Sequence, residues 1–148
     1  MLSCADHIRC DRFSGDMPTD EATLRIVTNT EVLAIQHSSR NNQQLSNTVA
    51  AVASAGGCKT ANTTFECNEV VWVADDGSGG QYVALFWTGA GNRTISTPIA
   101  VVRSSAANVH VRDLWARKDV GRVEAGGLLT AHLQGGDVAL FHLTKDNL

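Results

Sequence analysis

The chain has 148 residues, a length that corresponds to about one domain with a single core of ordinary size. Its net charge is −3 and its 12 basic residues are spread along the sequence, so neither a nucleic acid nor a membrane surface is expected as a partner. No apolar run approaches the length of a membrane span, and the first residues lack the apolar segment that a signal peptide needs.

Near the start of the chain, Cys4, His7 and Cys10 lie three residues apart. This spacing is typical of half a zinc site, but a structural zinc needs four ligands and no second Cys or His pair follows at suitable spacing. We therefore predict no metal site. Residues 11–18 can be interpreted as a short strand ending in a turn, or equally as a frayed start of the chain.

Two short helices are predicted between Thr19 and Ile35. Thr19 can cap the first helix, in which apolar side chains recur at helical spacing. Asn29 is a plausible left-handed stop, and Thr30 can then cap the second helix. Together the helices have an apolar side that needs a partner, and a small β-domain alone does not obviously supply one.

Residues 36–68 are polar and have little regular pattern. We interpret 36–44 as a linker that leads away from the helices. We interpret 46–68, which contains a run of Ala, Val and Ser followed by two cysteines, as an insertion before the first strand.

The insertion carries two modifiable features. Cys58 and Cys67 could form a disulfide across a hairpin if the compartment is oxidising. The triplet Asn62-Thr63-Thr64 fits the N-glycosylation acceptor sequence, and so does Asn92-Arg93-Thr94 further along. Asn62 and Asn92 are therefore possible N-glycosylation sites.

The strongest strand signal is a hairpin formed by residues 70–74 and 82–87 around the turn sequence D-D-G-S-G-G. The second run, Y-V-A-L-F-W, is apolar at every position, so we expect a central strand covered on both faces. Further strands are predicted at 93–97, 108–115, 120–124, 128–133 and 138–144, with a short apolar piece at 99–103. Seven or eight short strands separated by such turns indicate an antiparallel sandwich or barrel.

Two parts of the sequence resemble a known family. Residues 14–45 resemble the end of the catalytic barrel in α-galactosidases of glycoside hydrolase family 27, the melibiases: Gly15-Asp16 fills the place of a turn, and E-V-L-A-I at 31–35 that of a family motif. V-W-V-A-D-D-G-S-G-G-Q-Y-V-A-L-F-W and V-R-D-L-W-A-R-K-D-V-G, at 71–87 and 111–121, resemble the C-terminal β-domain of the same family. The resemblance covers 12–45 and 69–144, although the family's usual P-H-(G/D) turn is replaced by Q-G-G-D.

This resemblance implies a mainly β fold: an antiparallel β-sandwich of the Greek-key type with about 7–8 strands, preceded by one or two short helices left from the end of a (β/α)8 barrel. It divides the chain into 1–45, the remnant of the last barrel strand and helices with a linker; 46–68, the insertion; and 69–148, the sandwich domain.

For function, the resemblance implies a parent enzyme that performs retaining hydrolysis of terminal α-galactosides with two Asp residues. The nucleophile's K-Y-D setting occurs nowhere in this chain, and no strand and helix series that could build a barrel of about 200 residues is present. We therefore expect no catalytic residue, no cofactor and no activity in the chain alone, and leave substrate-binding residues open. Asp16 is expected to be a turn or cap residue.

The expected partner is a catalytic barrel domain, missing or on another chain, and a homo-oligomer is a further possibility. The location would be extracellular, lysosomal or vacuolar if the parent's signal peptide lies upstream. The alternative function is a stand-alone carbohydrate-binding or protein-interaction module, in which Trp72, Trp87 and Trp115 would form a sugar platform. We expect instead that each Trp is buried in the sandwich or against the barrel.

Other chemistry is weaker still. No Gly-x-Ser-x-Gly nucleophile elbow occurs, and residues 77–80 are interpreted as a hairpin turn rather than a phosphate loop. His110, His132 and His142 could form a metal trio, but we expect solvated or hydrogen-bonded strand histidines.

Overall fold

The computed structural model describes residues 20–49, 59–60, 63–64, 68–102 and 108–146. The strands of the larger sheet are β1 (Arg40–Val49), β4 (Asn68–Asp75), β5 (Gln81–Trp87), β7 (Val109–Asp113), β8 (Lys118–Val123) and β10 (Val138–Lys145). A second sheet pairs β6 (Arg93–Pro98) with β9 (Leu128–Leu133), and a separate small hairpin pairs β2 (Lys59–Thr60) with β3 (Thr63–Thr64). The helices are α2 (Glu21–Val27), α3 (Thr30–Ser38) and α4 (Ile99–Val102).

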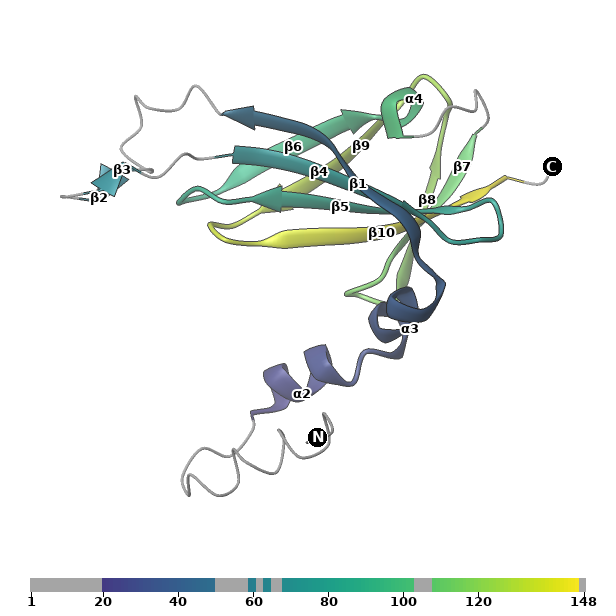
Figure 1. Cartoon of the computed structure of the whole chain (residues 1–148), viewed down its shortest axis with the longest axis horizontal. Coiled ribbons are helices and arrows are strands. Elements are labelled where there is room, and N and C mark those ends of the chain that lie inside the picture. Colours follow the sequence, from purple (N-terminus) through teal and green to yellow (C-terminus); the bar gives the residue numbers. More distant parts are fainter. Residues whose placement is uncertain (1–19, 50–58, 61–62, 65–67, 103–107, 147–148) are drawn as a thin grey trace.

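The two main sheets form an eight-stranded antiparallel sandwich. The larger sheet has the order β1-β4-β5-β10-β7-β8, and the β6–β9 sheet packs against one of its faces. Helices α2 and α3 lie at one end of the larger sheet, and β1 runs from α3 into that sheet (Figure 1). The predicted class, a mainly β antiparallel sandwich preceded by short helices, is confirmed. None of the described helices has the length and apolar character needed to cross a bilayer.

The predicted hairpin is strands β4 and β5. Their register pairs Val71 with Leu85 and Val73 with Val83, and all four side chains are buried in the core. The turn between the strands contains Gly77 and Gly79 at φ values of 79° and 93°, a left-handed conformation that glycine adopts without steric cost. The turn chemistry and the apolar runs therefore agree on one register.

The core lies between the two sheets. Val83, Leu85, Val109, Val111 and Leu143 from the larger sheet are completely inaccessible to solvent. The smaller sheet contributes the alternate side chains of its two strands, together with Ile99 and Val102 of α4. This burial of branched aliphatic side chains is the main stabilising term of the sandwich.

The prediction of a linker before β4 is wrong. Residues 36–44, interpreted as a linker, form the last turn of α3 and the first half of β1. Strand β1 is polar, R-N-N-Q-Q-L-S-N-T-V, but it pairs along β4 and so completes one edge of the sheet. It also crosses the predicted boundary between residues 45 and 46. Backbone pairing with a neighbour, rather than side-chain preference, makes this segment a strand.

The helix caps also differ from the prediction. Asp20 caps α2 by accepting a hydrogen bond from the Thr23 amide, while the predicted cap Thr19 lies outside the described residues. Asn29 is not a left-handed stop: its φ and ψ are −71° and 100°, and its side chain is the N-cap of α3. The apolar piece at 99–103 begins with the short helix α4 rather than a strand.

Several expectations fall on residues that the structure does not describe. They concern the N-terminal metal half-site, the barrel-end turn residue, the disulfide and one glycosylation site: Cys4, His7, Cys10, Asp16, Cys58, Cys67 and Asn62. These expectations remain predictions, as does the division of the chain into three parts.

Candidate functional site

The outer face of the larger sheet, which points away from the core, is apolar and only partly covered. On β5, Val83, Leu85 and Trp87 are buried, whereas the alternate residues Tyr82, Ala84 and Phe86 are half-buried. Cross-strand pairing continues this face outward, with Trp72 on one side of Ala84 and Leu140 on the other, and Trp72 is 40% exposed. We expected both faces of β5 to be covered. The core-facing side is fully buried, but the outer side is only half-buried.

Helix α2 has no buried residue. Its apolar side chains Leu24, Ile26 and Val27 are 44%, 57% and 46% exposed. The helix has seven residues, stabilised locally by the Asp20 cap and an exposed ion pair between Glu21 and Arg25. An isolated helix of this length is marginal in water, so α2 needs a tertiary partner.

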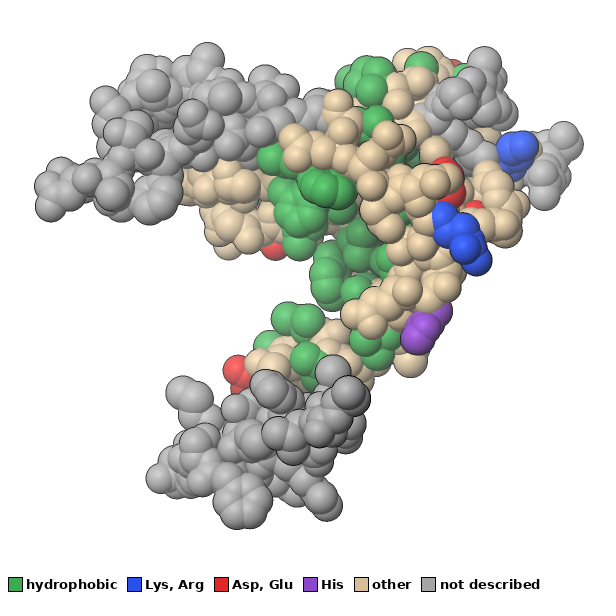
Figure 2. All heavy atoms as spheres, in the orientation of Figure 1, with side chains coloured by type: hydrophobic (Ala, Val, Ile, Leu, Met, Phe, Trp, Pro, Cys, Tyr) green, Lys and Arg blue, Asp and Glu red, His purple; other side chains and the backbone are tan. Residues whose placement is uncertain are grey.

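A hollow of about 500 Å³ separates α2 from the sandwich. Hydrophobic side chains gather on both sides of the notch between them (Figure 2). We call this hollow the apolar cleft. It is lined by Arg25, Ile26, Asp113, Trp115, His132, Leu133, Asp137, Val138 and Ala139.

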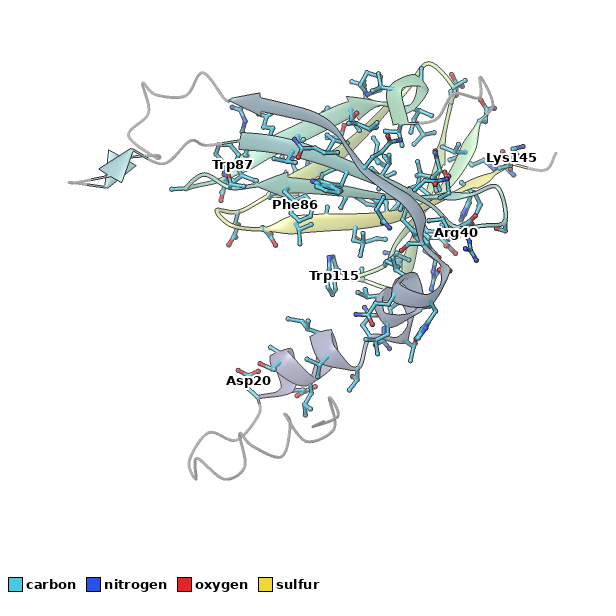
Figure 3. The ribbon with its side chains drawn as sticks, viewed as in Figure 1. Asp20, Arg40, Phe86, Trp87, Trp115 and Lys145 are labelled. Atoms are coloured by element: carbon cyan, nitrogen blue, oxygen red, sulfur yellow. The ribbon has the colours of Figure 1, made fainter. Side chains whose placement is uncertain are left out.

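Trp115 stands at the centre of the apolar cleft, between the sheet and α2 (Figure 3). Its indole Nε1 is buried and has no hydrogen-bond acceptor among the described residues. Leaving a buried N–H donor unpaired costs about 1–3 kcal/mol.

Helix α3 is fixed to the sandwich through Asn29, which is only 2% exposed. Its Oδ1 accepts hydrogen bonds from the amides of Glu31 and Val32, and its Nδ2 donates to the Leu114 carbonyl at 2.8 Å. One side chain thus caps the helix and ties it to the turn after β7. Arg117 in that turn donates to the Thr28 carbonyl at 3.3 Å, a second tie.

An ion-pair cluster reinforces this junction. Arg112 of β7 donates from Nε and Nη2 to both carboxylate oxygens of Glu31 at 2.8 and 2.7 Å, and from Nη1 to Asp119 at 3.0 Å. These hydrogen bonds lower the pKa of Glu31 and raise the pKa of Arg112 from their ordinary values. The two parallel hydrogen bonds between a guanidinium and a carboxylate fix the relative orientation of the two side chains as well as pairing their charges.

A further set of contacts ties α3 to the sandwich through the β4–β5 turn. Asp76 Oδ2 lies 2.9 Å from His142 Nε2, the His142 ring stacks on Tyr82, and the Tyr82 hydroxyl lies 3.0 Å from Ser38 Oγ of α3. Burial raises the pKa of Asp76, but hydrogen bonds from His142, Ser78 and Gly80 outweigh it and hold that pKa well below its usual range. Helix α3 is thus tied to three elements of the sandwich.

The residues singled out in the sequence have separate, structural environments. Trp87 is buried in the sandwich, Trp115 is half-buried and Trp72 is exposed. Burial of Trp115 and Trp72 against a barrel stays a prediction. His132 lies 2.8 Å from the Thr94 hydroxyl, and His142 is paired with Asp76, which fits hydrogen-bonded strand histidines. No group of three or more metal-ligating side chains occurs within the described residues.

Most acidic side chains near the sandwich are engaged in pairs. Glu21, Glu31, Glu69, Asp119 and Asp146 each bind an arginine, and Asp76 binds His142. The two acidic residues at the apolar cleft, Asp113 and Asp137, accept hydrogen bonds from the nearby amides of Ala116 and Val138. The arrangement of these carboxylates is that of turns and ion pairs.

The residues of the junction were not predicted from the sequence. The position of Asn29 directly before a Thr-Glu pair is typical of an N-cap, so the capping role of Asn29 could have been predicted. The pairing of Arg112 with Glu31 joins residues 81 positions apart, and nothing in the local sequence of either one signals it.

Comparison with known proteins gives a match to the family model of the "Alpha galactosidase C-terminal beta sandwich domain" over residues 67–143. A search of curated protein sequences gave no match. Among solved structures, the chain is similar to a glycoside hydrolase family 27 β-L-arabinopyranosidase from Geobacillus stearothermophilus, with a TM-score of 0.69 and 25% identity. That match covers 86% of this chain and 25% of the enzyme.

Two fungal enzymes share the fold at lower identity. The α-galactosidase of Saccharomyces cerevisiae, solved with raffinose, has a TM-score of 0.69 and 11% identity, covering 84% of this chain and 37% of that one. α-Galactosidase I of Mortierella vinacea has a TM-score of 0.63 and 15% identity, covering 86% and 29%. The chain thus spans about a quarter to over a third of these proteins, and the coverage of 84–86% means that the likeness extends well before residue 67.

Proposed function

The chain belongs to the α-galactosidase C-terminal β-sandwich domain family, and on that premise we propose that it is the non-catalytic C-terminal portion of an α-galactosidase-like glycoside hydrolase. The parent reaction would be the retaining hydrolysis of terminal α-galactosides. In such a reaction one carboxylate attacks the sugar while a second acts as general acid and base, the two lying about 5–5.5 Å apart. Both would reside in the part of the enzyme that precedes this chain.

The observation that carries the proposal is the apolar cleft. The hollow is bordered by Ile26, which is exposed on α2, and by Trp115, whose indole N–H has no acceptor among the described residues. The outer face of β5 in the same sandwich is only half-covered. Contiguous exposed apolar surface of this kind marks an interaction site. A catalytic barrel fits as the occupant because the matched enzymes are about three to four times as long as the part that resembles this chain.

In this proposal α2 and α3 are the last helices of the barrel and β1 is the first strand of the sandwich. The junction at Asn29, Glu31 and Arg112 then has a mechanical role, because it sets the angle at which the barrel meets the sheet. The sandwich would hold the barrel's final helix in place without contacting substrate.

The arrangement of the tryptophans does not favour a sugar-binding module. A stacking platform needs aromatic faces exposed in a row. Trp87 is 2% exposed and its ring lies under the Arg93 guanidinium, at 5.6 Å. Trp115 is directed into the apolar cleft, so Trp72 stands without an exposed Trp neighbour on its face.

The purified chain tests the proposal in an assay with an aryl α-galactoside. We expect no turnover above that of buffer, and no retention on immobilised galactosides. Turnover by the chain would overturn the proposal, and binding without turnover would favour the sugar-binding module. Sequencing of the transcript upstream of Met1 provides the complementary test, since it should encode an in-frame barrel with both catalytic carboxylates.

A further inference from the structure

Asn92 occupies an exposed turn between β5 and β6, and begins the triplet Asn92-Arg93-Thr94. The preceding residue, Gly91, has a φ of 73°, which turns the backbone before the chain enters β6. The acceptor asparagine is therefore at the corner of the sandwich, where an added group can project into solvent. An exposed turn is the position expected of an N-glycan in a secreted protein.

The middle residue of the triplet is held away from the acceptor. The Arg93 guanidinium lies over the Trp87 ring at 5.6 Å and pairs with Glu69 of β4. This long side chain is thereby engaged on the sandwich and does not cover the amide of Asn92. The hydroxyl of Thr94 is exposed, 2.8 Å from His132 Nδ1.

A hollow of about 320 Å³ begins at Asn92 itself. Its walls are formed by Asn92, Arg93, Thr94, His132, Leu133 and Gln134. Hydroxyl, imidazole and amide groups of this kind can hydrogen-bond the hydroxyl and acetamido groups of a sugar. The folded chain thus has room for a sugar joined directly to the Asn92 side chain.

We propose that Asn92 is an N-glycan attachment site and that the first sugar lies in this hollow. The donor is an oligosaccharide linked to a lipid pyrophosphate, which the secretory pathway supplies together with its transferase. A bond forms between Asn92 Nδ2 and the anomeric carbon of the sugar, while the bond from that carbon to the pyrophosphate breaks. The amide nitrogen loses one proton and the lipid pyrophosphate leaves.

The test is expression of the full chain behind a heterologous secretion leader in yeast, with secreted and cell-associated chain both analysed. We expect a glycan at Asn92, detected by peptide mass spectrometry and removed by peptide N-glycosidase. Asn92→Gln and Thr94→Ala should abolish it, whereas Thr94→Ser should retain it. Ser96→Ala is the matched control: Ser96 lies on the same exposed face of β6 and bonds Thr130, but it is outside the triplet.

The second triplet makes the result specific. Asn62→Gln should leave the Asn92 glycan in place. The proposal would be overturned if Asn92 were unmodified in molecules that carry a glycan at Asn62. It would also be overturned if Asn92 were unmodified in molecules that carry no glycan at all. Because the cell-associated chain is scored too, a variant that folds poorly still reports whether its Asn92 was modified.

Discussion

Asn29 is the residue on which the link between the helices and the sandwich depends most. It is buried, it satisfies two amides at the start of α3, and it donates to a carbonyl of the turn after β7. A serine or aspartate could perform the capping part of this role, whereas the amide of Asn29 supplies the acceptor and the donor from two separate atoms. The junction therefore uses both ends of one side-chain amide.

We expect Asn29→Ala to lower the free energy of unfolding by about 2 kcal/mol, since it loses the cap and leaves the Leu114 carbonyl without its side-chain donor. Urea unfolding of the two purified proteins measures this. Asp20→Ala is the control, because it removes the cap of the unburied helix α2 and should not measurably change global unfolding. A loss below about 0.5 kcal/mol for Asn29→Ala would mean that the junction contributes little.

Glu31 makes the same junction sensitive to acid. Its pKa is lowered by the hydrogen bonds from Arg112, so the folded state gains stability wherever the unfolded carboxyl, with a pKa of about 4.3, is ionised. That stability is present above this pH and is lost as the pH falls toward the lower pKa of the folded state.

Glu31→Gln should therefore cost about 1 kcal/mol at pH 7, and the difference from the unmodified chain should shrink as the pH falls below the unfolded pKa toward the folded one. Urea midpoints across this range provide the measurement. Glu21→Gln is matched chemically, but its partner Arg25 is on the same exposed helix, so we expect little change at any pH. A Glu31→Gln difference independent of pH would contradict the assigned role.

At the scale of elements, α2 contrasts with the strands of the core. Its apolar side chains are as hydrophobic as those of β6 or β9, but they contribute little stability because they remain in water. The contribution of an apolar side chain to the free energy of unfolding depends on its burial. The same substitution should therefore have a small effect in α2 and a large effect in the core strands.

Ile26→Ala and Ile95→Ala compare these places directly, since Ile26 is 57% exposed and Ile95 is 1% exposed. We expect a loss of about 2–5 kcal/mol in the free energy of unfolding for Ile95→Ala, and less than about 0.5 kcal/mol for Ile26→Ala in the isolated chain. A cost above about 1 kcal/mol for Ile26→Ala would show that α2 packs within this chain and awaits no partner.

The elements differ in how far the sequence predicts them. Strand β9 was predicted with its observed bounds because glycine-rich turns flank it and its apolar residues alternate. Strand β1 was missed because its polar residues carry no period, and its conformation is set by hydrogen bonds to β4. Short-range patterns report local structure, and pairing between distant segments is invisible to them.

The apolar cleft shows the same limit. The unbroken apolar run of β5 predicted cover on both of its faces, and the described residues bury only the core-facing side completely. The helical pattern before it predicted an apolar side without a partner. Neither pattern could say that Ile26 of α2 and Trp115 border one hollow, or that the Trp115 N–H has no acceptor among the described residues. Those facts depend on the angle at which Asn29 and Arg112 hold α3.

At the scale of the whole molecule, a well-packed sandwich is joined to a helix, α2, whose apolar side chains are exposed. Helix α3 is tied to the sandwich by side chains from three elements, but α2 beyond it is bordered by the apolar cleft. In the proposed parent enzyme the barrel would occupy this space. In the isolated chain the stability of the molecule should therefore be unequal along the sequence.

Hydrogen exchange of the chain, in solutions that sedimentation shows to be monomeric, tests this account most directly. We predict that the amides of residues 21–27 exchange at rates close to those of an unstructured peptide, while the central amides of β5 and β10 exchange only through global unfolding. High protection of α2, equal to that of the sheet in a strict monomer, would contradict the claim that the apolar cleft is an interface awaiting its barrel.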